Sequence, residues 1–190
     1  MIKIALVSDA RLFSLVEQHG SHLVNSGFAE PRQQSRQILW RSIEGMLHEL
    51  ESNIYEDQTY KRLVDFGHIF SPLLEAASGY EIAHGEAVAM DMALTCAVAS
   101  QLGLLNEADR DRIIATFTTL RLPLFSPLLT EQLCLDAFAE SMRHRGGATN
   151  FVVPAEIGRG SFVERMEELS PAVLRAAICW LIGHVEAIGV

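Results

Sequence analysis

The segment from Val64 to Ala89 constrains the fold most, because it places two histidines on either side of a helix break. His68 ends an Asp-Phe-Gly-His run, and His84 opens a long apolar stretch. Pro72 lies between them and predicts a helix, a turn and a second helix start. Such a bend can bring distant side chains to one point. Neutral imidazoles are common metal ligands, so His68 and His84 are either a ligand pair or two buried structural histidines.

Length and composition indicate one domain, residues 1–190, with 49% apolar residues to form its core. The net charge of -9 argues against nucleic acid and against an anionic membrane surface as partners. The three cysteines are scattered in apolar patterns, as expected for reduced thiols. The sequence shows neither a signal peptide nor a membrane-spanning stretch. We therefore expect a soluble, cytoplasmic protein.

The spacing of apolar residues predicts a mostly α fold with several helices. Residues 1–7 could form a buried strand or a helix. Within 32–50, six apolar positions recur at helical spacing: Ile38, Leu39, Ile43, Met46, Leu47 and Leu50. Further helices are expected over 10–19, 84–105, 107–120 and 131–142, and a last one from Pro171. Residues near 150–164 predict a small β-hairpin around Gly158.

The helix predicted over 84–105 is the most apolar of the chain and is expected to run through the centre of the domain. Asp91 lies within it. Because an isolated buried charge is very costly, this carboxylate must be paired or line a cavity. Glu86, near the start of the helix, suits the helix dipole.

Residues 61–75 and 82–89 closely resemble the dehydroquinate synthase superfamily of sugar phosphate cyclases. Dehydroquinate synthases usually carry Asn where this chain has Asp65, and a second His where it has Pro72. The Asp-Phe-Gly-His-x-Phe-Ser-Pro form is more similar to the valiolone-type and deoxygadusol-type cyclases, which act on sedoheptulose 7-phosphate. The resemblance implies that His68 and His84 bind a catalytic Zn²⁺, with Co²⁺ as a possible substitute.

The resemblance also implies that this chain is the C-terminal, mostly helical metal-binding domain of a longer enzyme. The family binds NAD in an N-terminal α/β domain, and no glycine-rich phosphate-binding motif occurs in this sequence. The third zinc ligand of the family is a glutamate three residues before the position of Lys3, which falls immediately before Met1. Three explanations are consistent with a glutamate position before Met1: the sequence is a fragment, its start codon is placed too late, or it is one half of a split enzyme. We expect the chain alone to be inactive, and to associate with an NAD-binding domain or subunit and with copies of itself.

Five further residues are candidate catalytic groups. The resemblance implies that Lys3, His144 and Arg145 counter the charge of phosphate or of an intermediate, and that Asp65 positions the substrate. Lys61 matches a family position that is often basic. Local chemistry allows simpler roles: Asp65 as a helix cap, and the basic residues before Gly146 as a solvated helix end.

The reaction implied by the resemblance is a phosphate-eliminating cyclisation of a ketose phosphate, which needs both NAD and the metal. Three alternatives stay open. The chain could belong to a 3-dehydroquinate synthase, to an iron-dependent alcohol dehydrogenase, or to a non-catalytic helical partner module.

Overall fold

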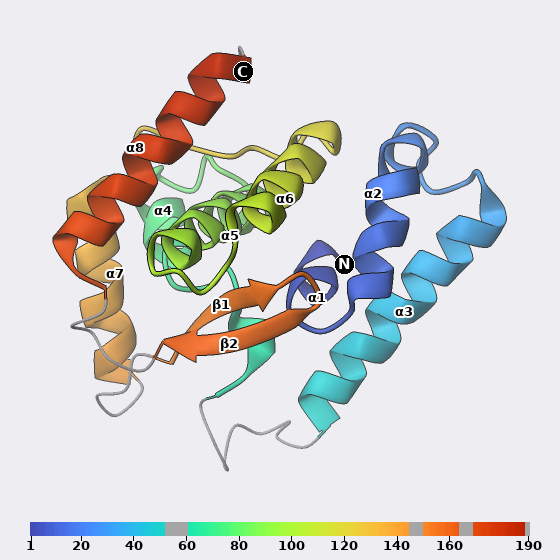
Figure 1. Ribbon diagram of the computed structural model, residues 1–190, viewed down its shortest axis with the longest axis horizontal. Coiled ribbons are helices and arrows are strands. Elements are labelled where there is room, and N and C mark those ends of the chain that lie inside the picture. Colours follow the sequence, from blue (N-terminus) through green and yellow to red (C-terminus); the bar gives the residue numbers. More distant parts are fainter. Residues whose placement is uncertain (52–60, 145–149, 164–168, 189–190) are drawn as a thin grey trace.

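The computed structural model describes residues 1–51, 61–144, 150–163 and 169–188. Its helices are α1 (Ile2–Val7), α2 (Ala10–Asn25), α3 (Arg32–Glu51), the short 3-10 helix η1 (Leu63–Asp65), α4 (Ser71–Ala77), α5 (His84–Gln101), α6 (Glu107–Thr119), α7 (Glu131–His144) and α8 (Pro171–Ile188). Strands β1 (Phe151–Glu156) and β2 (Arg159–Val163) form an antiparallel hairpin. Figure 1 shows α4, α6 and α8 beside α5, and the hairpin between α5 and the N-terminal helices α1, α2 and α3. The predicted mostly α fold with one small hairpin is confirmed.

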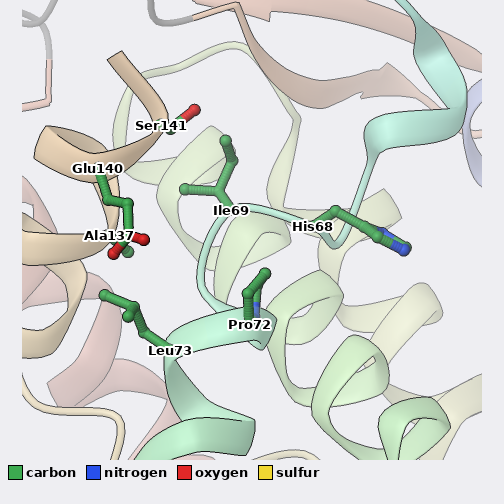
Figure 2. A pocket seen from close by; sticks show the side chains of 7 residues that line it. All are labelled: His68, Ile69, Pro72, Leu73, Ala137, Glu140 and Ser141. Carbon is green, nitrogen blue, oxygen red and sulfur yellow. The ribbon is translucent and has the colours of Figure 1, made fainter. Parts of the chain in front are cut away.

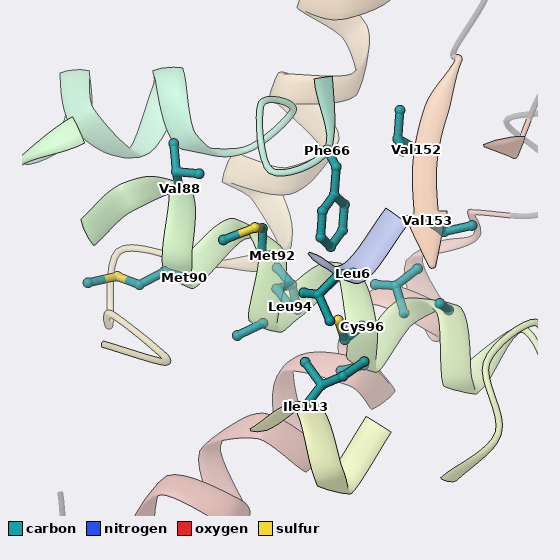
Figure 3. Close-up of a cluster of buried hydrophobic side chains, with 14 of the residues drawn as sticks. Leu6, Phe66, Val88, Met90, Met92, Leu94, Cys96, Ile113, Val152 and Val153 are labelled. Carbon is teal, nitrogen blue, oxygen red and sulfur yellow. The ribbon is translucent and has the colours of Figure 1, made fainter. Parts of the chain in front are cut away.

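Helix α5 is the centre of the domain, as its composition predicts. Every residue from Ala87 to Ala99 is buried, and the helix packs against α4, α6, α8 and β1. A helix that is apolar all round must be covered on all sides. Side chains from several elements surround it in Figure 3, namely Leu6, Phe66, Ile113, Val152 and Val153.

Asp91 is the buried charge of α5, and the structure gives it three partners. Its Oδ2 atom accepts hydrogen bonds from the backbone N–H groups of Phe70 (2.6 Å) and Ser71 (2.8 Å). Its Oδ1 atom accepts one from the hydroxyl of Thr95, at 3.1 Å. The carboxylate thus satisfies backbone donors at the start of α4 that would otherwise be unpaired. Of the two predicted arrangements of Asp91, paired or lining a cavity, the structure shows the first, and the pairing fixes α4 to α5.

The first residues of the chain form a helix. Residues Ile4 to Val7 of α1 are all buried, and the carbonyl of Leu6 accepts a hydrogen bond from the N–H of Gly158 at 2.9 Å. Gly158 has φ +86°, and a Cβ atom there would lie 2.2 Å from the backbone nitrogen of Ala10. Glycine is therefore required at the hairpin turn, because it packs directly on the α1–α2 connection.

Helix α3 forms as predicted, but most of its apolar residues are not buried against the rest of the chain. Ile38 is fully buried, but Leu39, Trp40, Ile43 and Leu47 are 42%, 68%, 58% and 62% exposed. The helix packs against α1, α2 and η1 through the face that carries Ser35, Ile38 and Gly45. Gly45 permits this approach, since a Cβ atom there would lie 2.6 Å from Cγ2 of Ile4. Helical periodicity alone does not reveal that much of the apolar set lies on the opposite side.

None of the helices in the described part of the chain combines the length and the apolar character that crossing a membrane requires.

Candidate metal centre

His68 and His84 lie together although 16 positions separate them in sequence. Their ring centroids are 5.5 Å apart, and the rings are inclined at 71°. His68 follows η1 and is half-buried, whereas His84 is the first residue of α5 and its side chain is 65% exposed. Helix α4 and the turn after it bring the two rings together, as the predicted bend requires.

Gly67 sets the position of His68. Its φ of +78° lies in the left-handed region that favours glycine, and a Cβ atom there would lie 2.7 Å from Cγ of Met92 and 3.2 Å from the carbonyl oxygen of Val88. The glycine before His68 therefore lets the chain turn while it touches α5.

The Nδ1 atom of each histidine already has a partner. Nδ1 of His84 lies 2.9 Å from Oε1 of Glu75. Nδ1 of His68 lies 3.0 Å from Nζ of Lys3 and 3.3 Å from the carbonyl oxygen of Phe66. These contacts leave Nε2 of both rings for a further ligand. A carboxylate that accepts the second ring N–H of a histidine is the usual support of a metal ligand, which makes Glu75 the orienting group for His84.

Glu75 is the residue that sequence analysis missed. Its place in α4 between the two histidines was visible, but no pattern in the sequence revealed that the turn after α4 folds back toward it.

Lys3 lies inside the site rather than at its edge. Its Nζ donates a hydrogen bond to the carbonyl of Val64 at 2.8 Å. Burial lowers the pKa of Lys3 to about 8, against the opposing effects of Asp65 and Asp91. Burial, and then the charge of Lys3, also lower the pKa of His68. His68 is therefore held in the neutral form, which is the form that binds metals.

The donor set fits part of a zinc site. Within the described ranges, no group of three or more His, Cys, Asp and Glu side chains is arranged to hold a metal. Catalytic zinc ordinarily has three protein ligands. The two imidazoles, with Nδ1 held and Nε2 available, supply two of these.

The remaining predicted site residues are Asp65, Lys61, His144 and Arg145. Asp65 accepts a hydrogen bond from Nη2 of Arg62 at 2.8 Å, and its charge acts on both Lys3 and His68. It ends η1 rather than capping the start of a helix. Lys61 is exposed. His144 is the last residue of α7, and Arg145 lies outside the described residues.

A pocket of about 200 Å³ adjoins His68 and is lined by residues of the η1–α4 segment and of α7. Figure 2 shows Glu140 of α7 on the opposite side of this pocket from His68. The hydroxyl of Ser141 is buried and has no hydrogen-bond partner in the described part of the chain. The pocket therefore reaches the metal centre only at His68, since His84 is not among the residues that line it.

Comparison with known proteins decides the family. Residues 1–144 match the family model described as "3-dehydroquinate synthase C-terminal". The chain belongs to this family. A 2-epi-5-epi-valiolone synthase of Streptomyces albus is 40% identical over 94% of the chain, and a demethyl-4-deoxygadusol synthase of Trichormus variabilis is 30% identical over 91%. The chain spans 43% and 44% of the lengths of these two relatives.

A solved structure shows the same fold. The enzyme ValA, a 2-epi-5-epi-valiolone synthase of Streptomyces hygroscopicus with NAD⁺ and Zn²⁺ bound, superposes with a TM-score of 0.89 at 40% identity. The match covers 96% of this chain and 49% of that one. The fold of this chain is that of about half of a family enzyme, and the predicted resemblance to the cyclases is confirmed.

Proposed function

We propose that this chain is the metal-binding half of a zinc- and NAD-dependent sugar phosphate cyclase that acts on sedoheptulose 7-phosphate or a related ketose phosphate. The observation that carries the proposal is the pairing of His68 with His84, with Glu75 holding the second ring. Two histidine rings 5.5 Å apart, each held through its Nδ1 atom, are the arrangement expected of two ligands of one metal. The similarity to cyclases over nearly the whole chain supports the same function.

A third ligand is part of the proposal through the resemblance alone, which implies a glutamate three positions before Lys3. Lys3 itself, in the first turn of α1, contacts His68.

The residues around the pair have distinct tasks in this proposal. His68 and His84 hold the metal, which when bound polarises substrate hydroxyl and carbonyl oxygens. Lys3, as a half-buried cation beside His68, counters negative charge on the substrate. Asp65 acts with Lys3 and positions a substrate hydroxyl, while His144 and Arg145, at and just after the end of α7, bind the phosphate.

The oxidation and reduction steps are assigned to the NAD-binding half, in the same protein or in a separate subunit. Without that half, the chain is expected to bind metal weakly and to be inactive.

Zinc binding by the purified chain tests the metal site. The wild type is compared with His68→Ala and His84→Ala in competition with a chromogenic chelator, and His184→Ala serves as the control because His184 stacks on Trp180, away from the pair. Loss of zinc in both site variants but not in the control is the expected result. Equal zinc affinity in all four proteins would contradict the proposal.

A second experiment tests the activity. The NAD-binding half of a valiolone synthase is added to the chain, and the mixture is supplied with sedoheptulose 7-phosphate, NAD⁺ and Zn²⁺. Release of inorganic phosphate only when both halves are present is expected. Turnover by the chain alone would overturn the assignment of the redox step to the other half.

A further inference from the structure

Helix α4 begins without a cap from its own sequence, and the acceptor that it lacks comes from α5. Phe70 is the N-cap residue of α4 and makes no side-chain cap hydrogen bond. The N–H groups of Phe70 and Ser71 instead donate to Oδ2 of Asp91, at 2.6 and 2.8 Å. The next residue, Pro72, has no N–H group to satisfy. Asp91 therefore acts as an N-cap that a neighbouring helix supplies.

The turn that carries His68 ends at these same donors. The hydroxyl of Ser71 donates a hydrogen bond to the carbonyl of Gly67 at 2.8 Å, which closes the turn on itself. The N–H of His68 donates to the carbonyl of Asp65 at 3.0 Å. His68 therefore lies in a short closed segment, and the end of this segment is fastened to Asp91.

Asp91 and His84 lie on one face of α5. Seven positions separate them, which is about two turns of the helix and roughly 10 Å along its axis. The closed turn packs on the same part of α5, since a Cβ atom at Gly67 would lie 2.7 Å from Cγ of Met92 and 3.1 Å from Cγ1 of Val88. Helix α5 therefore carries one of the two histidines and holds the segment that carries the other.

We infer that Asp91 is a positioning residue of the metal centre, which sets His68 in its place beside His84. Phe70 and Ser71 are fully buried, so a shift of the turn along α5 would leave their N–H groups without a partner. Apolar contacts are not directional and oppose such a shift less. The inference rests on the proposed function where it concerns zinc, whereas the placement of the two rings does not depend on metal.

Asp91 has another partner, which allows positioning to be separated from stability. Thr95, one turn further along α5, donates its hydroxyl hydrogen bond to Oδ1 of Asp91 at 3.1 Å. Thr95→Val removes this bond but keeps both bonds to the closed turn, so it is the matched control. Asp91→Asn is the conservative variant, because its amide oxygen can still accept from Phe70 and Ser71. Asp91→Ala removes every bond to the turn.

Two measurements on the purified chain test the inference, one without metal and one with zinc. Nuclear Overhauser effects (NOEs) between the ring protons of His68 and His84 report whether the two rings, with centroids 5.5 Å apart, stay together. Chelator competition gives the zinc affinity. Asp91→Ala is expected to lose the NOEs and to bind zinc about 10-fold more weakly, as when other groups that orient metal ligands are removed. Asp91→Asn and Thr95→Val should keep the NOEs and the zinc affinity of the wild type.

Asp91→Leu, which fills the space with an apolar side chain, replaces Asp91→Ala if the smaller variant does not fold. A wild type without the NOEs, or NOEs and zinc affinity that stay unchanged in the folded variant, would overturn the inference. An equal loss in Thr95→Val would also overturn it, because the effect would then follow from stability alone. A wild type that shows the NOEs but binds no zinc would contradict the proposed function, and the NOEs of the Asp91 variants would still decide the positioning role.

Discussion

Oε1 of Glu75 lies 2.9 Å from Nδ1 of His84, and this contact joins α4 to the start of α5. Glu75 belongs to α4, which begins three positions after His68, and His84 is the first residue of α5. The carboxylate is mostly buried while the imidazole is 65% exposed. A ring that is largely open to solvent is thus held in one orientation by a group anchored in the protein.

Glu75→Ala is expected to weaken zinc binding by roughly 10- to 100-fold, because a ligand that loses its supporting carboxylate loses orientation and basicity. Glu75→Gln should lose less, since its amide oxygen can still accept the N–H of His84. Chelator competition on the purified proteins gives the affinities. Glu81→Gln, a nearby exposed carboxylate, is the control. Zinc affinity unchanged in Glu75→Ala would show that the contact does not support a ligand.

The two glycines beside the histidines should respond in opposite ways to alanine. Gly67→Ala forces a Cβ atom to within 2.7 Å of Met92 at φ +78°, so it should destabilise the fold by roughly 2 kcal/mol or more. Gly85 lies in the first turn of α5 with no atom within 4 Å of such a Cβ, and Gly85→Ala should stabilise by up to about 1 kcal/mol. Urea unfolding of both variants measures the difference. Equal destabilisation would contradict the assigned role of Gly67.

The sequence predicts those parts of the fold in which the chemistry of a residue and its burial allow few arrangements. The apolar run of α5 could be covered only at the centre of the domain, and Asp91 within it had to find partners. The bend between His68 and His84 followed from Pro72, which lies between them. In each case one physical requirement left few alternatives.

The sequence does not predict the contacts of a residue when they depend on which distant helix or strand packs against it. The apolar residues of α3 specify a helix, but not that α1 and α2 cover the side of Ile38 and leave Trp40 exposed. The role of Lys3 in countering the charge of phosphate or of an intermediate stays a prediction, but its contact with His68 was not foreseen because it depends on how α1 packs against η1. Glu75 was missed for the same reason. Such tertiary contacts leave no periodic signal in the sequence.

Asp9 is expected to be one of the stronger contributors to stability outside the core. Its Oδ1 accepts a hydrogen bond from the N–H of Leu12 at 2.9 Å as the N-cap of α2, and the same carboxylate binds Arg41 of α3. Asp9→Ala should lower the free energy of unfolding by about 1–2 kcal/mol. Arg41→Met, which keeps the cap, should lower it less. Urea midpoints of the two variants decide the matter, and a larger loss in Arg41→Met would show that the ion pair outweighs the cap.

Asp91 should make stability depend on pH. Burial raises its pKa to about 6, against the lowering effect of its hydrogen bonds from Ser71, Phe70 and Thr95. The folded protein therefore holds this proton more tightly than the unfolded chain does. In the pH range between the ordinary aspartate pKa and 6, stability from this group falls as pH rises.

Acidification from pH 7 to pH 5 should accordingly stabilise the wild type relative to Asp91→Asn by about 1 kcal/mol, since one pKa unit corresponds to about 1.4 kcal/mol. The asparagine variant is the reference because it keeps the size of the side chain and an acceptor oxygen but does not titrate in this range. Urea unfolding of both proteins at pH 5, 6 and 7 gives the difference, in which the titration of all other groups cancels. A difference that is constant with pH would mean that Asp91 titrates alike in both states. A difference that moves the other way would mean that its hydrogen bonds outweigh its burial.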